Sequence, residues 1–485
     1  MRLPVTCVLG LALATGAAAQ DQPASAAELA RLRAELQQTR SQLDDSLHQI
    51  DELRKSVEAL RRQMQAGQPA SAAVVPPAAK PTAAEADKDI GFLAAKVEEL
   101  HQDKVESGSK YPVKLSGLVL FNSYRDNGDV DLADVPSLAF PAPPGTGSAG
   151  ASLRQTLLEI QSTGPKLLHA QSSADLSVDF AGGSPTTPYG ATAGIIRLRT
   201  ANLHLDWQNT SLTIGQDAPP MSPLSPTSYA TMLEPALAWS GNLWVWTPQI
   251  TAERRFALND SSTLVLQGGL LDPLTEEEPD FQENEPGAGE ITRAPGVAGR
   301  IALDRWSAAH HAFAIGFGSY RARQSYTPFP EIGSWTVNAD WKARLGNLFE
   351  LSGEWYRGQA AGGLGGGIWT SVVYPEPTGT HTAIQALRST GGWAQLKFSP
   401  NLRYEFNAAA GQDENFGADL RAFSNPFTVN GYPALKKNLT GFGNFIFKPN
   451  SVLLFALEYR HIVTTPAVGA SARGSQVNLA VGAKF

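Results

Sequence analysis

Cysteine is almost absent from this chain of 485 residues, because Cys7 is the only one. Cys7 lies in a segment that we expect to be removed, so the mature chain has no thiol for disulfides, catalysis or cysteine-based metal sites. No apolar run reaches the length of about 18 residues that a transmembrane helix needs. The formal net charge of −7 also lacks the strongly basic balance of a nucleic-acid-binding protein.

Catalytic and metal-binding motifs are equally scarce. The run GGLGGG at residues 362–367 is not followed by the Lys-Ser/Thr of a phosphate loop, so we expect a mobile external loop there. His310 and His311 have no further ligand at metal-binding spacing, and no G-x-S-x-G motif occurs. We therefore predict no enzyme, no metal site and no cofactor.

The N-terminus has the pattern of an export signal. Arg2 precedes an apolar run at residues 5–14, and Ala17, Ala18 and Ala19 form an A-x-A cleavage site. We predict a signal peptide at residues 1–19 and a mature chain that enters the periplasm. The residues before Cys7 do not match a lipoprotein signal, so we expect no lipid anchor.

A heptad repeat follows in residues 20–65 and predicts a parallel α-helical coiled coil. Arginines at the e positions face glutamates at the g positions, which is the charge pattern of paired helices. A single amphipathic helix lying on a surface is the alternative, although its apolar stripe would be wider. The apolar positions of the repeat are Leu29, Leu32, Leu36, Leu43, Ile50, Leu53, Val57, Leu60 and Met64.

The rest of the chain divides into three further parts. Residues 66–88 are rich in alanine and proline and predict an extended linker. Residues 89–107 predict a short periplasmic helix. Residues 108–485 predict an outer-membrane β-barrel, because two-residue alternation replaces the helical period.

Connection lengths in this last part alternate between short and long. Such an alternation gives about sixteen antiparallel strands, with tight turns at one end and long loops at the other. The short connections are expected at residues 162–165, 208–210, 259–262, 304–309, 345–347, 399–401 and 448–451. The long ones are expected at residues 125–150, 182–193, 217–242, 272–293, 323–331, 358–381, 412–436 and 463–474.

The strand at residues 475–485 has the apolar-out, polar-in alternation of a membrane barrel and stops at Phe485. An edge strand of a soluble sandwich is the alternative for this segment alone. Other strands repeat the pattern, since Leu453, Leu457 and Tyr459 would face lipid while Glu458 faces the lumen. Aromatic residues beside the short turns would form a girdle: Trp207, Trp341, Phe398, Tyr404, Phe447 and Phe485.

One strand does not fit a single alternation. Arg197 and Arg199 share parity with Leu203 and Leu205, so we expect a bulge near Ala201. The bulge would keep both arginines in the lumen and spare them the cost of facing lipid.

This organisation resembles the trimeric coiled-coil porins of the DcaP type and is similar in plan to the phosphate-selective porins. Local motifs that carry the resemblance are few: KVESGSKY at residues 104–111, LSGLVLFN at 115–122, RLR at 197–199 and IGQ at 214–216. The resemblance implies a homotrimer in the bacterial outer membrane, surrounded by outer-membrane lipid and passing small polar solutes. It also implies that Phe485 is recognised by the barrel-assembly machinery.

The resemblance also implies that the connection at residues 217–242 folds inward and narrows the pore, with Asp217 and Glu234 as its acidic residues, and its prolines suit a stiff, irregular backbone. A basic wall opposite would sort solutes by charge, or its members would simply hydrate the lumen and pair with neighbouring acids. The candidate pore-lining residues are Arg197, Arg199, Arg255, Arg300, Lys397, Arg403, Glu458 and Arg460.

We therefore expect a porin for passive diffusion of small hydrophilic solutes, with a slight preference for anions and with no nucleic-acid partner. The alternative is a structural anchor whose periplasmic coiled coil tethers the barrel to the cell wall. The acidic run at residues 276–278 is expected in a solvated external loop, or as a place where divalent cations bridge to lipopolysaccharide.

Overall fold

The computed structural model describes residues 111–183, 194–276, 285–306 and 312–485. The predicted signal peptide, coiled coil, linker and short helix lie outside these residues, and so do His310 and His311. In the described part, no helix is long and apolar enough to cross a membrane.

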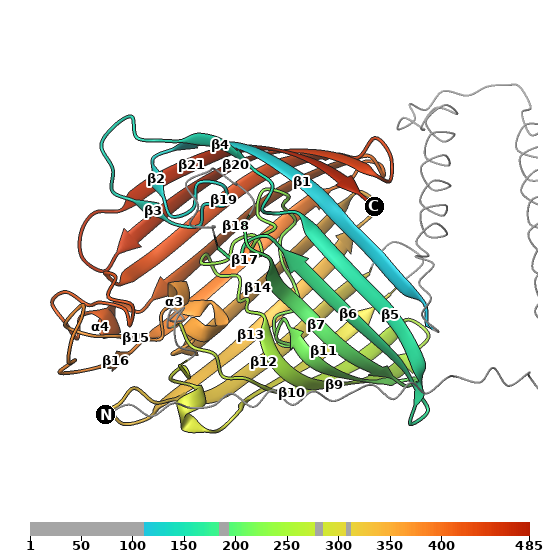
Figure 1. Cartoon of the computed structure of the whole chain (residues 1–485), viewed down its shortest axis with the longest axis horizontal. Helices are drawn as coiled ribbons and strands as arrows, with labels where there is room; N and C mark the ends of the chain where they lie inside the picture. The colour runs from blue at the N-terminus through green and yellow to red at the C-terminus, as the bar shows by residue number, and fades with distance from the viewer. Residues whose placement is uncertain (1–110, 184–193, 277–284, 307–311) are drawn as a thin grey trace, which may run out of the picture. The chain divides into compact units, whose positions relative to one another are not determined.

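A single closed antiparallel sheet dominates the described part of the chain (Figure 1). Strands β4 and β5 both pair with β1, one after the other, and act as two parts of one strand. The barrel therefore has sixteen strand positions, as predicted, and the pairing of β1 with β21 closes it. Its strands are β1 (Val113–Asn127), β4 (Ala149–Ser152), β5 (Leu157–Leu167), β6 (Ala170–Asp179), β7 (Arg197–Asp206), β8 (Thr210–Asp217), β9 (Thr247–Asn259), β10 (Ser262–Leu271), β11 (Gly296–Arg305), β12 (Phe313–Gln324), β13 (Ile332–Leu345), β14 (Phe349–Gln359), β17 (Arg388–Phe398), β18 (Tyr404–Asn415), β19 (Leu435–Phe447), β20 (Leu453–Pro466) and β21 (Ala472–Lys484).

Short and long connections alternate along the barrel, with two corrections to the predicted positions. The first short turn is at residues 168–169, because β5 continues through an irregular register near Thr163 to Leu167. The last long connection shrinks to residues 467–471, because β20 and β21 each extend beyond their predicted ends. On β5 the sheet continues past Gly164 and Pro165, which have weak strand propensity, whereas the added residues Val463 and Thr464 of β20 are β-branched and favour a strand.

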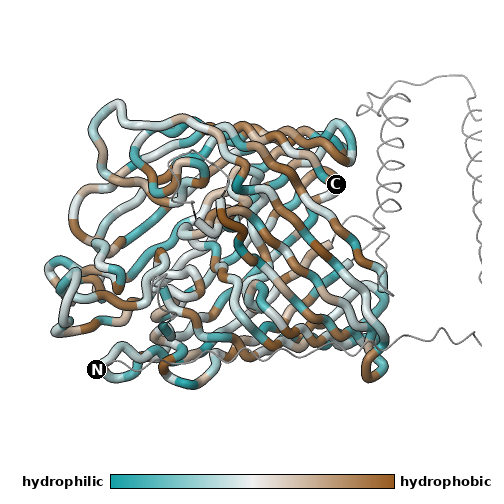
Figure 2. Tube along the Cα trace, viewed as in Figure 1, coloured by the Kyte–Doolittle hydropathy of each residue, from teal (hydrophilic) through white to brown (hydrophobic). Residues whose placement is uncertain are grey.

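Inward and outward faces follow the predicted alternation where it was clean. On β20, Leu457 and Tyr459 are 51% and 54% exposed, whereas Glu458 and Arg460 are 3% and 2% exposed. The exposed residues are the apolar ones, the reverse of a water-soluble protein. Figure 2 shows apolar positions recurring along the strands of the barrel.

Aromatic rings form a ladder across the outer face near the short turns. Phe349 of β14 stacks on Phe398 of β17 at 4.9 Å between ring centroids, and Tyr404 of β18 stacks on Phe447 of β19 at 5.3 Å. Phe398, Tyr404 and Phe447 are three of the residues predicted for an aromatic girdle. Cross-strand aromatic pairs of this kind also strengthen the sheet.

Short elements fill the connections at the long-loop end, at the left of Figure 1. They are β2 (Asp129–Val130), β3 (Ala139–Phe140), η1 (Glu290–Thr292), η2 (Gly362–Leu364), α3 (Gly366–Trp369), β15 (Val372–Val373), β16 (Gln385–Ala386) and α4 (Gly417–Leu420).

The glycine-rich run at residues 362–367 corrects our prediction of a mobile external loop. Gly362, Gly363 and Leu364 are buried, and the backbone N–H of Gly367 donates to the Tyr356 hydroxyl at 2.7 Å. The close backbone approach explains the glycines, since a Cβ on Gly363 would lie 1.8 Å from the carbonyl oxygen of Leu274. This segment therefore packs inside the mouth of the barrel.

Glu276 corrects a second prediction, that of a fully solvated acidic loop. Its side chain is 1% exposed, and Oε1 accepts a hydrogen bond from the backbone N–H of Ser371 at 2.7 Å. Residues 277 and 278 lie outside the described part.

Candidate functional site

The connection at residues 218–246, between β8 and β9, lies inside the barrel and is here called the inward loop. Its apolar residues are buried, with Met221, Leu237 and Leu243 between 0% and 2% exposed. The Met221 carbonyl accepts a hydrogen bond from the side chain of Asn338 on β13. The structure thus has the inward folding that the resemblance to porins implied for this connection.

Hydrogen bonds attach the inward loop to several strands of the wall. Ser228 donates to Glu458 Oε2 on β20 at 2.6 Å, and the Tyr229 carbonyl accepts from Asn122 on β1 at 2.9 Å. A few residues later, the Met232 carbonyl accepts from Arg199 on β7 at 2.7 Å. The loop therefore occupies part of the lumen and reduces its cross-section.

Arg197 and Arg199 both reach the inward loop and share one carboxylate. Arg197 binds Asp179 through two hydrogen bonds of 2.6 and 3.1 Å, and Arg199 Nη1 lies 3.5 Å from the same carboxylate. Both guanidinium groups lie over the Trp246 ring, at 5.1 and 4.6 Å from its centroid. The Glu159 carboxylate also interacts electrostatically with Arg199, so the cluster holds two guanidinium groups and two carboxylates.

A bulge in β7 makes this arrangement possible. Ser177 pairs with Thr200 and Val178 with Leu198, so Arg199 is the extra residue between them. The bulge was expected near Ala201 and lies two residues earlier. It lets Arg197 and Arg199 face inward while Leu198 and Leu203, each more than 40% exposed, face outward.

Arg300 and Arg460, also predicted to line the lumen, form ion pairs with carboxylates. Arg300 forms two hydrogen bonds of 2.7 and 2.8 Å with Asp340, and both side chains are buried. Arg460 lies 3.0 Å from Glu458, the residue that anchors Ser228.

Lys397 shares Glu405 with Lys448, at 3.4 and 3.2 Å. This is a second place where two cations meet one carboxylate. Arg403 lies in the turn before β18 rather than on the strand, and its backbone N–H donates to Asn401 at 2.9 Å.

Asp217 and Glu234, the two acidic candidates of the predicted connection at residues 217–242, lie in different surroundings. Asp217 is the last residue of β8 and accepts a hydrogen bond from Asn202 at 3.1 Å. Glu234 instead accepts hydrogen bonds from Ser137 and from the Trp239 indole, the latter at 3.3 Å. Burial of its carboxyl group, with Asp131 nearby, raises the pKa of Glu234 to about 7.

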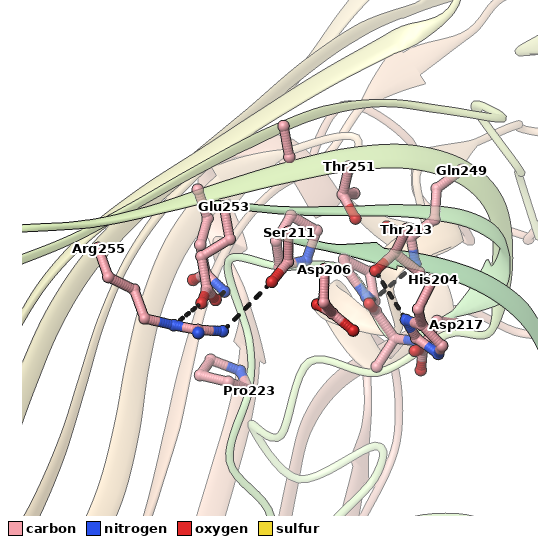
Figure 3. A pocket seen from close by; sticks show the side chains of 15 residues that line it. His204, Asp206, Ser211, Thr213, Asp217, Pro223, Gln249, Thr251, Glu253 and Arg255 are labelled. Carbon is pink, nitrogen blue, oxygen red and sulfur yellow. Dashed lines mark hydrogen bonds and ion pairs between the residues drawn. The ribbon is translucent and has the colours of Figure 1, made fainter. Parts of the chain in front are cut away.

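A cavity of about 370 Å³ lies where the start of the inward loop faces β7 to β10 (Figure 3). Arg255 points to Glu253 and Ser211 in this view, at 2.5 and 3.4 Å. His204 contacts Thr213 at 3.1 Å. The residues that line the cavity are His204, Asp206, Ser211, Thr213, Asp217, Ala218, Pro219, Pro220, Pro223, Gln249, Thr251, Ala252, Glu253, Arg255 and Gln267.

Sequence reasoning missed the acidic character of this cavity. Asp206, Asp217 and Glu253 line it together with a single arginine, Arg255. His204 and Asp206 follow Asn202 at two-residue spacing, so their inward orientation follows once the bulge at Arg199 is placed. The missing signal was therefore the position of the bulge.

Comparison with solved structures supports the barrel assignment. The outer membrane channel DcaP of Acinetobacter baumannii has a similar structure, with a TM-score of 0.58 at 14% identity, covering 79% of this chain and 99% of that chain. The anion-selective porin from Comamonas acidovorans gives a TM-score of 0.50 at 10% identity, covering 78% of this chain and 100% of that chain.

No protein-family model and no curated protein sequence matches the chain. The likeness to solved structures therefore concerns the fold, as expected when identities are this low. At the level of the fold, the resemblance to DcaP-type channels that the sequence indicated is confirmed: the described part of the chain is a sixteen-stranded porin-like barrel.

Proposed function

We propose that this chain is an outer-membrane porin that lets small hydrophilic solutes diffuse passively, without a cofactor or a chemical reaction. The observation that carries the proposal is the inverted barrel wall, apolar outside and polar inside, combined with the inward loop. On β13, Val337 is 44% exposed on the outside, whereas Asn338 and Asp340 are buried on the inside. A closed barrel of this polarity satisfies its backbone in lipid and encloses a polar lumen.

The aromatic ladder on the outer face supports the proposal that the barrel spans a lipid bilayer. Phe398, Tyr404 and Phe447 lie near the short turns, where a girdle at the membrane interface belongs. We infer that the end with the short turns faces the periplasm. The predicted export signal directs the chain to the periplasm, and the predicted coiled coil of residues 20–65 precedes the barrel.

A mild preference for anions is the selectivity that we propose. Arg197 and Arg199 place two guanidinium groups beside the inward loop, and Lys397 and Lys448 share the carboxylate of Glu405. The acidic cavity of Figure 3 opposes this preference, through Asp206 and Asp217. The narrowed region should dominate, because ions pass closer to the wall charges there and less electrolyte screens them.

We further propose a homotrimer surrounded by outer-membrane lipid and assembled through recognition of Phe485 by the barrel-assembly machinery. Support for the trimer is the heptad repeat of residues 20–65 together with the apolar outer wall. Deletion of residues 20–89 should leave a barrel that remains trimeric in mild detergent but dissociates at a lower temperature than the full chain. A monomer after deletion would mean that the helices supply the whole association, and a dimer of the intact chain would contradict the trimer.

A structural anchor is the second candidate function, and the filled lumen favours it. The inward loop and the buried segment at residues 362–367 both occupy the interior at the long-loop end. Such a barrel could be closed and serve to tether the outer membrane to the cell wall through the coiled coil.

Conductance of the purified full-length chain in a planar lipid bilayer separates the two functions. The porin proposal predicts stable open steps that group in threes for a trimer. A silent bilayer, with protein shown by heat-dependent gel mobility to be folded, would contradict the porin and leave the anchor. Leakage of small dyes from vesicles loaded with the same protein gives a second readout.

A further inference from the structure

A second cavity, here called the mouth cavity, lies at the long-loop end of the barrel and has a volume of about 620 Å³. That size suits a small organic molecule. Segments from several connections converge on it, including the inward loop through Trp239. Its lining is Asp131, Leu138, Ala139, Phe140, Pro141, Trp239, Glu276, Ile368, Trp369, Thr370, Thr428, Asn430, Tyr432, Pro433, Leu435, Thr464, Pro466, Val468, Gly469, Ala470 and Ala472.

Aromatic rings are prominent in this lining. Trp239 and Trp369 meet edge to face, with ring centroids 4.7 Å apart and an interplanar angle of 87°. Trp369 is 42% and Tyr432 60% exposed, so these large rings remain available to a ligand. Exposed aromatic surface at a recess is more informative than scattered apolar residues elsewhere.

The two tryptophans are held in a costly backbone conformation. Trp239 has φ of 63° and Trp369 has φ of 55°, both in the left-handed region that L-residues rarely adopt. Such strain persists only where the surrounding structure fixes the residue, and it gathers at ligand-binding sites.

Polar side chains of the lining are largely engaged within the protein. Thr464 donates to Asn438 at 2.7 Å, and Thr370 donates to the Ile368 carbonyl at 3.2 Å. Asn430 donates to the Glu276 carbonyl at 3.0 Å. A sugar needs many free hydrogen-bonding groups, so this lining suits a ring-shaped apolar group better than a sugar.

The charged side chains among the described lining residues of the mouth cavity are all acidic. Asp131 and Glu276 are the only ionisable acids among its described lining residues, and lysine, arginine and histidine do not occur among them. Asp131 Oδ1 accepts hydrogen bonds from the backbone N–H groups of Ser137 and Leu138 at 2.9 and 3.0 Å, which fixes the carboxyl group at the cavity.

From these observations we propose that the mouth cavity binds a small organic cation that carries an aromatic ring. The ring would pack on the indoles and apolar side chains, and the cationic group would lie against ring faces and Asp131. Cations are attracted to tryptophan faces, and a nearby carboxylate adds to that attraction. Binding at the mouth does not require the proposed porin function, so the two can fail separately.

Binding is measured by ligand-observed NMR titration of the full-length chain in detergent micelles with four probes. Benzyltrimethylammonium has ring and positive charge, tetramethylammonium only the charge, benzyl alcohol only the ring, and benzoate the ring with negative charge. We expect benzyltrimethylammonium to bind roughly tenfold more tightly than the next best probe. Equal binding of benzoate or of tetramethylammonium would overturn the proposal.

Three variants locate the site. Asp131→Asn keeps the Oδ1 acceptor and removes the charge, so it should weaken benzyltrimethylammonium about tenfold and leave benzyl alcohol unchanged. Trp369→Ala should weaken the binding of benzyltrimethylammonium and of benzyl alcohol, and Trp369→Phe should restore part of that binding. Trp306→Ala removes a tryptophan that is 69% exposed and does not line the mouth cavity, and it should change nothing.

Wild-type affinity in both Asp131→Asn and Trp369→Ala would overturn the assignment of the site. Heat-dependent gel mobility identifies any variant that fails to fold. If Trp369→Ala fails to fold, the binding measured for Trp369→Phe shows whether the loss of binding comes from the missing ring or from the missing fold.

Discussion

A Cβ atom placed on Gly117 would lie 2.7 Å from Cζ of Phe485, because the phenyl ring packs over the glycine on the outer face of the barrel. The two residues also exchange backbone hydrogen bonds of 3.0 and 3.2 Å. This pair extends the ladder between β1 and β21, so the contact lies at the seam that closes the barrel. A glycine beneath an aromatic ring is a recognised way to fix strand register.

Gly117→Ala should therefore destabilise the closing seam. The added methyl group would also meet the Leu157 carbonyl oxygen at 2.6 Å, and backbone cannot move aside cheaply. We expect a loss of about 1–3 kcal/mol, measured as denaturant unfolding of the barrel in detergent. Gly443→Ala on β19 is the matched control, since its nearest neighbour would be 3.8 Å away, and equal stability of the two variants would contradict the prediction.

Glu234 should make the fold less stable as the pH rises. Its folded-state pKa of about 7 lies above the ordinary value of 4.5, so the folded chain holds a proton that the unfolded chain has released between these values. The stabilising contribution is full below about pH 4.5 and is lost by about pH 7. The Ser137 hydroxyl, the Trp239 indole, Asp131 and Arg460 face this carboxyl group.

The temperature at which the barrel unfolds on a gel, measured at pH 5 and pH 8, checks this. The wild-type chain should unfold at a lower temperature at pH 8, and Glu234→Gln should reduce the difference. An unchanged difference in Glu234→Gln would assign the pH dependence to other groups.

Much of the fold could be predicted from the sequence because alternation and connection length are local signals. The outward orientation of Leu457 and the inward orientation of Glu458 follow from neighbouring residues alone. The turn at residues 168–169 was misplaced because Gly164 and Pro165 look like a turn but lie within an irregular part of β5. In that part of β5, the hydrogen bonds of the sheet determine the backbone conformation, and the local turn signal does not.

The candidate site was less predictable because its properties depend on register. Arg300 looked like a free lumen charge, but Asp340 lies two strands away in space and neutralises it. The burial of Leu364 depends on contacts with distant connections, and no periodicity in its own segment indicates that. A bulge in β7 was predictable, because Arg197 and Arg199 could not face the lumen while Leu203 faced lipid without one. Its position at Arg199 was not predictable.

The buried pair of Arg300 and Asp340 should be costly to break. Asp340→Ala leaves a guanidinium group that is 9% exposed with its hydrogen bond to Gln267 but without the two to Asp340, so we expect a loss of about 3–5 kcal/mol in denaturant unfolding. Replacing both residues with apolar ones should recover part of this loss.

The exposed pair of Arg323 and Glu331 is the control for that experiment. Their side chains are 61% and 46% exposed, so Glu331→Ala should cost at most about 1 kcal/mol. Similar losses for the exposed and the buried pair would contradict the burial argument.

Arg197 and Arg199 should set the charge preference of the proposed pore. Replacing both with serine removes two positive charges beside the inward loop and leaves Asp179 without its partners. The zero-current potential in a salt gradient should then shift toward cations, and the conductance should rise because the side chains are shorter. Asp179→Asn should shift the potential the other way, toward anions.

Arg254→Ser is the matched control for this last experiment. Arg254 alternates with Arg255 on β9 and points away from the cavity that Arg255 lines, so its loss should leave the potential unchanged. An unchanged potential in the double serine variant would mean that both arginines are paired off in the wall and do not act on permeating ions. The acidic cavity around Asp206 and Asp217 would then dominate, and a cation preference of the wild-type channel would follow.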